Sequence, residues 1–496
     1  MHSATKKKVL PVALLGTLFL NACGGGGGSS SSSTSMGPPP TPAPARSACG
    51  ASSALSGIGS PASAGRLFAQ TTAAYDDRHL EVYYRTKPFL RGEDRFKNVE
   101  SFDGIISGTD IGPGPQNTVA RVVTVRPGHL DAVNGYLRGR PEIADVVPVR
   151  LRAPKISVPI VPNDPLFDNK TQWDMFVIGM EHAWGYTTGD PNVQIAVIDT
   201  GFDPANRELQ GKVAFYETID KGNGSIDSSA AAIVDTDGHG TNVSGIAADE
   251  TNNSYGFAGV GFNVKLQEYK VIGTTGCGSV ADEIVAINEA VRHNAKVINL
   301  SIGGTQCPDS PDPAEAAAIA NAINKGVVVV AAASNDAPKC TQISYPAGYA
   351  GVIAVGASAL NDSNPKQLSE YVAPYSNYTA SATNSLSLVA PGGDPSSGND
   401  PDVRHWISNI YSNSATKFAC TFQPCSILIA GTSQATPHVS GAAALLFSIR
   451  PGFSVAHVKD LLQKTADDIG GGAKQGSGRL NVYRALAVGS GDPNPP

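Results

Sequence analysis

The sequence predicts an α/β domain with a mainly parallel central sheet over residues 159–490, preceded by a smaller α+β unit. From residue 166 onward, short and continuous apolar runs alternate with helical stretches. Such runs are typical of parallel strands that are buried on both faces. A strand–helix–strand pattern over residues 119–152 indicates the smaller unit.

Composition excludes one class of partner. The chain has 496 residues, of which 41% are hydrophobic, so it can build a substantial core and more than one domain. Only 16% of the residues are charged, and the net charge is -6. Nucleic-acid binding needs a basic face, so we expect no nucleic-acid partner.

The first 22 residues are predicted to be a signal peptide. Three lysines at 6–8 precede the apolar run 9–20, which is too short to span a bilayer as a helix. The run ends in Leu20-Asn21-Ala22-Cys23, which resembles a bacterial lipoprotein signal and implies lipidation of Cys23. A plain secretory signal cleaved near Ala22 is the alternative.

Residues 23–46 are predicted to be a tether, flexible and Gly/Ser-rich first and then stiffer and Pro-rich. A tether fits a chain whose end is fixed to a membrane. We therefore expect an exported lipoprotein at the outer membrane or cell surface, and Gly24 favours the outer membrane of a Gram-negative cell.

Three segments predict the strand–helix–strand pattern of the smaller unit. Residues 119–125 alternate like a strand, residues 128–139 have apolar positions at helical spacing, and residues 144–152 form a second strand. The Pro-punctuated stretch 156–165 is predicted to be a connector.

In the larger domain, strands are predicted at 193–201, 264–272, 296–304, 327–334 and 351–358. Helices are predicted at 279–295 and at 314–326, the latter stopped by Gly326. In parallel sheets the functional groups gather at the carboxyl ends of the strands.

Three motifs place polar side chains at such ends. Asp199 lies in "VIDTG", His239 in "DTDGHGTNVSG" and Ser433 in "GTSQATPHVSG". Alone, each is a turn former, a loop imidazole or a helix cap. Aspartic proteases need two "DTG" elements, and a second copy is missing. The joint occurrence in the order Asp, His, Ser favours a nucleophilic triad.

With these motifs, roughly residues 160–485 resemble the subtilisin family of serine proteases, peptidase S8. The resemblance implies a three-layer fold and a serine endopeptidase that acts on proteins or peptides. It implies an acyl-enzyme on Ser433, with His239 as general base and Asp199 orienting it.

The resemblance also implies an oxyanion site made by the backbone N–H of Ser433 and the amide of Asn335. A turn residue is the alternative for Asn335. Three positions depart from the family pattern: Ser334 replaces Gly, Gln434 replaces Met, and Asn242 replaces His.

The substrate is expected to lie as an added strand between two edges. The resemblance assigns one edge and the wall of the first specificity pocket to Ser301, Ile302, Gly303 and Gly304. It assigns the opposite wall to the segment around Gly276 and the pocket floor to Ser344. We expect a preference for medium to large apolar side chains.

No cofactor is expected for catalysis, but residues 250–260 resemble the family's calcium loop. The implied ligands of a structural Ca²⁺ are Asn253, the carbonyls of Tyr255 and Phe257, and the side chains of Glu208 and Gln172. A plain surface loop is the alternative.

The chain has seven cysteines, and an exported protein can form disulfides. Cys420 and Cys425 are close enough to close a local loop. Cys307–Cys340 is the preferred second pair, with Cys277–Cys307 as its rival.

Residues 47–158 are predicted to be a propeptide, with an inhibitor-type unit at about 119–152, and a retained accessory domain is the alternative. The chain's own propeptide and, through the lipid, the membrane are therefore expected partners. Residues 491–496 are a tail.

Two other functions compete. A non-enzymatic surface lipoprotein would not need the triad and Asn335. An esterase would carry G-x-S-x-G around the nucleophile and a different order of motifs, neither of which the chain shows.

Overall fold

The computed structural model describes residues 75–86, 94–150, 158–274, 276–361, 369–396, 398, 400–420, 423–492 and 495–496. Contacts within the chain divide it into two units, with the division between residues 156 and 157. The predicted signal peptide, tether and lipidation site at Cys23 lie outside the described residues. Among the described helices, none has the length and hydropathy needed to cross a membrane.

The smaller unit is a four-stranded antiparallel sheet with the strand order β2-β3-β1-β4. Its apolar side chains form a separate core between one face of the sheet and two helices. The predicted strand, helix and strand correspond to β3, α3 and β4. The elements are β1 (Tyr75–Arg85), α2 (Asp94–Glu100), β2 (Ile105–Pro113), β3 (Thr118–Val125), α3 (Leu130–Arg138) and β4 (Ile143–Arg150).

The larger unit has an eight-stranded sheet with the order β11-β10-β9-β8-β5-β7-β6, and β12 also pairs with β10. All neighbours are parallel except β10 and β11, so the prediction of a mainly parallel sheet is confirmed. The strands are β5 (Gln194–Asp199), β6 (Val213–Thr218), β7 (Lys265–Lys270), β8 (Val297–Leu300), β9 (Val328–Ala332), β10 (Ile353–Asn361), β11 (Ser369–Val372) and β12 (Leu388–Pro391).

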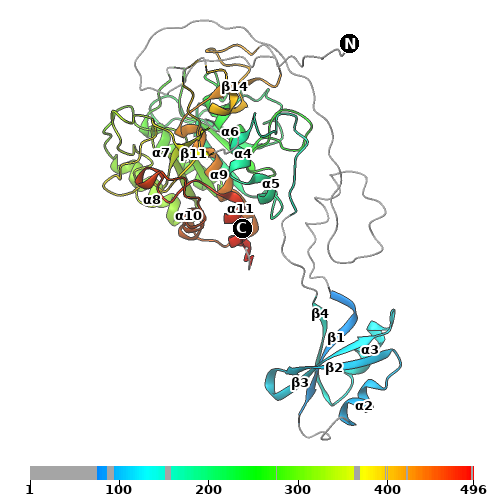
Figure 1. The fold of residues 1–496 in the computed structure, drawn as a ribbon. Coiled ribbons are helices and arrows are strands. Elements are labelled where there is room, and N and C mark those ends of the chain that lie inside the picture. The colour runs from blue at the N-terminus through cyan, green and yellow to red at the C-terminus, as the bar shows by residue number, and fades with distance from the viewer. Residues whose placement is uncertain are drawn as a thin grey trace, which may run out of the picture. The chain divides into compact units, whose positions relative to one another are not determined.

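Helices cover both faces of this sheet (Figure 1). Successive residues of a strand point to opposite faces, so Ile195 and Val197 of β5 pack with α6 and α9, whereas Ala196 and Ile198 pack with α7 and α8. The helices are α4 (Trp173–Val177), α5 (Met180–Ala183), α6 (His239–Ala248), α7 (Val280–Arg292), α8 (Pro313–Asn324), α9 (Thr432–Ile449), α10 (Val455–Lys464) and α11 (Val482–Ser490).

A two-stranded antiparallel ribbon, β13 (Ile407–Ile410) with β14 (Ser426–Ile429), precedes α9. The sheet and the helices on its two faces make three layers. Several chain segments meet at the carboxyl ends of the parallel strands. The parallel strands β5, β8 and β9 end at Asp199, Leu300 and Ala332, and the segments that follow them carry the predicted functional residues.

Candidate active site

Asp199 and His239 form a buried pair where β5 ends and α6 begins. Asp199 Oδ1 lies 2.7 Å from His239 Nδ1, and the two residues are 0% and 3% exposed. Gly240 N donates to Thr200 Oγ1 at 2.7 Å, which ties the first turn of α6 to the end of β5. Burial alone lowers the pKa of His239, but the charge of Asp199 and the hydrogen bond outweigh it and raise that pKa above its ordinary value.

Asp235 positions the start of α6. Its carboxylate accepts hydrogen bonds from Gly238 N at 2.8 Å and from Thr241 N and Oγ1 at 2.9 and 2.7 Å. Gly238 has a φ of 100°, and a Cβ there would lie 2.0 Å from the ring of Tyr411. The turn before His239 therefore requires glycine. We did not assign a role to Asp235 from the sequence, although it stands four residues before His239 in the same motif.

Ser433 is the second residue of α9 and is 7% exposed. Its hydroxyl donates to Ser301 O at 2.9 Å, and Ser301 Oγ donates to Ser433 O at 2.8 Å. His239 Nε2 is buried and has no hydrogen-bond partner among the described residues. The hydroxyl must therefore leave the Ser301 carbonyl and turn toward His239 Nε2 before its proton can be transferred.

Asn335 is oriented by the residue that precedes Ser433. Asn335 Oδ1 accepts hydrogen bonds from the N–H and the hydroxyl of Thr432, both at 2.9 Å. A Cβ placed on Gly431 would lie 3.5 Å from Asn335 Nδ2 and 3.7 Å from Ser433 N. The two donors thus border the same small space, as an oxyanion site requires.

Ser334, the residue before Asn335, occupies the left-handed region with a φ of 94°. A non-glycine residue in such a conformation costs on the order of 1–3 kcal/mol. The neighbouring strand end and the hydrogen bond from Asn377 N to Ser334 O at 3.0 Å hold the backbone there.

We therefore expect Ser334→Gly to raise the free energy of unfolding by about 1 kcal/mol, because relief of backbone strain exceeds the entropy that glycine adds to the unfolded chain. Urea unfolding measures the change. Ser225→Gly is the control, since Ser225 is exposed and lies outside the left-handed region, and it should lower stability. A decrease in both variants would contradict the strain assignment.

Gln434 and Asn242, two of the departures from the family pattern, form a hydrogen bond with each other. Gln434 Nε2 donates to Asn242 Oδ1 at 3.2 Å, and Asn242 Nδ2 donates to Ile410 O at 3.1 Å. Both side chains are almost fully buried, and buried polar groups need such partners. The pair also links the first turn of α9, which carries Ser433, to the first turn of α6, which carries His239.

A pocket of about 340 Å³ adjoins Ser433 and Asn335. Its walls include all four residues predicted for one edge and the glycine predicted for the other: Ser301, Ile302, Gly303, Gly304 and Gly276. Ser344, predicted for the pocket floor, is buried directly behind Gly303, where a Cβ would lie 3.3 Å from Ser344 Oγ. Its hydroxyl accepts a hydrogen bond from Gly304 N at 2.9 Å, and the next residue, Tyr345, lines the pocket.

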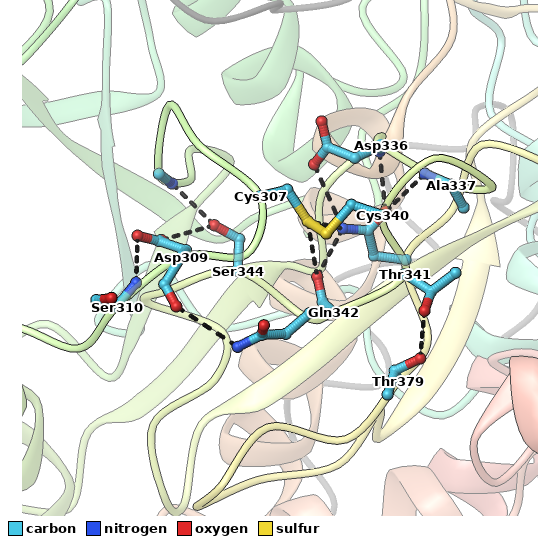
Figure 2. The surroundings of a disulfide bond; sticks show 12 residues. Cys307, Asp309, Ser310, Asp336, Ala337, Cys340, Thr341, Gln342, Ser344 and Thr379 are labelled. Carbon is cyan, nitrogen blue, oxygen red and sulfur yellow. Dashed lines mark hydrogen bonds between the residues drawn. A yellow bond between two sulfur atoms is a disulfide. The ribbon is translucent and has the colours of Figure 1, made fainter.

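Two disulfides match the predicted pairs. Cys420–Cys425 closes a loop with a Cα–Cα distance of 5.4 Å, and Cys307–Cys340 joins the segment after the pocket wall to the segment after Asn335, with a Cα–Cα distance of 5.9 Å (Figure 2). The rival pair Cys277–Cys307 is therefore wrong. Cys277 is itself disulfide-bonded.

A cluster of buried carboxyl groups lies at the loop that resembles a calcium site. Asn253 Nδ2 donates to Glu208 Oε1 at 3.3 Å, and Asp164 accepts from Asn252 N and Asn253 N at 2.7 and 3.0 Å. Within the described part of the chain, Glu208 Oε2, Asn253 Oδ1 and both carboxylate oxygens of Asp249 are buried without a hydrogen-bond partner.

Burial, followed by the neighbouring negative charges, raises the pKa of Glu208 to about 8 and that of Asp249 well above its usual range. Burial also raises the pKa of Asp164 to about 6. Oxygen donors of these types suit a hard cation, although Glu208, Asp249 and Asp164 do not place one carboxylate oxygen each within 4.8 Å of one another. Gln172 does not belong to it, because both of its amide atoms bond to the backbone of Ala258. The sequence analysis missed Asp164, which lies in the predicted connector 156–165.

Comparison with known proteins places this chain among proteases. A family model described as the subtilase family matches residues 190–484. The thermophilic serine proteinase of Bacillus sp. (strain AK1) is 32% identical over 82% of this chain and 87% of its own length. Thermitase of Thermoactinomyces vulgaris is 34% identical over 66% of this chain and 99% of its own. A solved protease structure from Pseudoalteromonas arctica matches with a TM-score of 0.56 and 28% identity, covering 67% of this chain and all of that one.

Proposed function

Because the chain belongs to the subtilase family of serine endopeptidases, we propose that it hydrolyses peptide bonds through an acyl-enzyme on Ser433. His239 is the general base, and Asp199 orients it. The observation that carries the proposal is the 2.7 Å contact between Asp199 Oδ1 and His239 Nδ1, which leaves His239 Nε2 without a partner among the described residues.

The reaction follows from these positions. Ser433 Oγ attacks the carbonyl carbon of the substrate while His239 Nε2 takes its proton. The charge that develops on the carbonyl oxygen accepts hydrogen bonds from Ser433 N and Asn335 Nδ2. His239 then gives the proton to the leaving amine, and a water molecule repeats the sequence to release the acid. Asp199 stabilises the protonated imidazole throughout.

An activated ester substrate tests this scheme. Acylation should be faster than deacylation for such a substrate, so the leaving group should appear in a burst equal to the concentration of folded enzyme. A linear time course from the first turnover would argue against accumulation of an acyl-enzyme.

We also propose that the carboxylate cluster holds a structural Ca²⁺. The supporting observation is the set of buried oxygens without partners on Glu208, Asn253 and Asp249, together with Asp164. Tyr255 and Phe257 would contribute their carbonyl oxygens. Bound Ca²⁺ would neutralise part of the negative charge that the cluster concentrates in a buried place.

Removal of Ca²⁺ by a chelator is expected to lower Tm by about 5 °C. A ligand at 100 times its Kd contributes about 2.7 kcal/mol, and each kcal/mol shifts Tm by roughly 2 °C in a domain of this size. Differential scanning fluorimetry with added Ca²⁺ checks it. Asp164→Asn should reduce the response to Ca²⁺, whereas Asp460→Asn, in an exposed ion pair with Lys464, should keep it. An equal response in both variants would rule out the proposed ligand.

For localisation we propose an exported lipoprotein, lipidated at Cys23, with residues 47–158 as a propeptide. Support comes from the signal-like N-terminus and from the separate core of the smaller unit. Cleavage between about residues 153 and 163 would cut the peptide link between the lipid and the endopeptidase. Maturation would then release the enzyme from the membrane.

Membrane fractionation of the wild type beside Ser433→Ala checks release. We expect the wild type to appear in the soluble fraction at reduced size, and the variant to stay with the membrane at full length. Equal membrane retention of both full-length proteins would refute the release proposal.

A further inference from the structure

The pocket beside Ser433 has an acidic wall, which bears on the substrate of the proposed peptidase and rests on that function. Four acidic residues line it, and its described lining contains no Lys, Arg or His. The four are Glu283, Asp309, Asp312 and Glu315. The apolar preference expected from the sequence did not take them into account.

Glu283 and Glu315 lie in the first turns of α7 and α8, which pack side by side against the same face of the sheet. They are 7% and 3% exposed. Glu315 Oε2 accepts a hydrogen bond from Tyr349 at 2.7 Å. Glu283 Oε1 is buried and has no partner in the described part of the chain. A buried carboxylate oxygen without a partner is costly, so its retention beside a pocket points to a ligand.

The carboxyl groups of Glu283 and Glu315 also repel each other when both are charged. Burial is the largest cause that raises the pKa of Glu283 well above its usual range, and the negative charge of Glu315 adds to it. The pKa of Glu315 is raised as well, again mainly by burial. Burial and mutual repulsion therefore disfavour two negative charges at this place, and a cation bound between the two carboxyl groups would stabilise both.

Asp309 adds charge to the same wall and is held firmly in place. Its Oδ2 accepts hydrogen bonds from Ser344 Oγ at 2.9 Å and from Tyr345 N at 3.1 Å. Figure 2 shows Asp309 beside Ser344, two residues after the disulfide at Cys307. The fourth residue, Asp312, caps α8 through Ala314 N and Glu315 N. Hydrogen bonds to the backbone and to buried side chains therefore fix the positions of these acidic residues.

We propose that the acidic wall makes the enzyme selective for a substrate with an arginine or lysine side chain near the scissile bond, bound between Glu283 and Glu315. Arginine is the better fit. Its planar guanidinium donates several hydrogen bonds in a fixed fork and satisfies carboxylate oxygens in pairs. A cation in this position supplies the partner that Glu283 Oε1 lacks within the described residues.

The test compares arginine with citrulline, which has nearly the same shape but no charge, at each position of a quenched peptide around the scissile bond. We expect kcat/KM to be roughly 10- to 100-fold higher for arginine at one position, the range for hydrogen bonds to charged groups. This comparison uses the wild-type enzyme, so it does not depend on whether a variant folds.

Variants locate the effect. Glu283→Gln and Glu315→Gln should each reduce the arginine preference about tenfold at that position while neutral peptides are still cleaved. Glu289→Gln is the matched control, because Glu289 lies on the same helix but pairs with Arg292 outside the pocket. It should keep the preference.

Equal cleavage of arginine and citrulline peptides at every position, by an enzyme that still cleaves neutral peptides, would overturn the specificity proposal alone. A preference that millimolar Ca²⁺ removes would assign the pair to a metal ion and also overturn it. If the wild-type enzyme cleaves none of the peptides, the result would contradict the proposed peptidase mechanism and, with it, the specificity proposal.

Discussion

Ser433→Ala is expected to lower kcat on a peptide substrate by about 10⁶-fold, a magnitude that comes from loss of the nucleophile in a subtilisin. The neighbouring hydroxyl of Thr432 is held by Asn335 Oδ1 at 2.9 Å, so it should not replace the nucleophile. The oxyanion donors Ser433 N and Asn335 Nδ2 remain, so a small residual acceleration over uncatalysed hydrolysis should persist.

Steady-state kinetics on purified, matured protein measures this loss. Ser448→Ala is the control on the same helix, since Ser448 bonds to Ala444 O and Asp190 N far from the site. It should keep kcat within about twofold, in line with small effects of surface substitutions. A similar loss of kcat in both variants would attribute the loss to damage to α9 and not to removal of the nucleophile.

Asp199→Asn is expected to lower kcat by about 10⁴-fold, because an amide at this place favours the wrong tautomer of His239. The same substitution should move the acid limb of the kcat/KM profile to lower pH. In the wild type, the charge of Asp199 raises the pKa of His239 against the effect of burial. Activity requires neutral His239, so wild-type activity falls as the pH drops through a value above the ordinary 6.5 or so. Without that charge the pKa of His239 falls, and the limb moves to lower pH.

Asp174→Asn is the matched control for Asp199→Asn. Asp174 Oδ2 lies 2.9 Å from His438 Nε2 in a second buried carboxylate–imidazole pair, which lies outside the site. Its loss should reduce stability but leave the acid limb in place. The double variant of Asp199 and Ser433 should be no slower than Ser433→Ala alone, since the residues act as a unit. Additive losses would contradict the triad.

The sequence predicted the parts of this enzyme that depend on local pattern. Asp199, His239, Ser433 and Asn335 each lie in a short motif at a strand end or helix start. Parallel strands buried on both faces give continuous apolar runs that are easy to recognise.

The errors and omissions arose from side chains whose contacts are distant in the sequence. Ser344 donates a hydrogen bond to Asp309, which itself lines the pocket, and Gln172 bonds to Ala258. Asp164 reaches the carboxylate cluster from the connector. Glu283 and Glu315 stand alone in two helical patterns, and only the packing of α7 against α8 brings them together at the pocket. In the smaller unit, β2 was missed because most of its side chains are exposed and do not alternate. β1 was also missed, although Leu80, Val82 and Tyr84 alternate with less buried neighbours.

Labelling by a fluorophosphonate tests the central claim most directly, because the reagent phosphonylates a serine only where a base activates it. Peptide mapping of the matured wild type should find one adduct, on Ser433, with none in Asp199→Asn under the same brief exposure. An adduct on another serine, or undiminished labelling of Ser433→Ala, would contradict the assignment of Ser433 as the nucleophile.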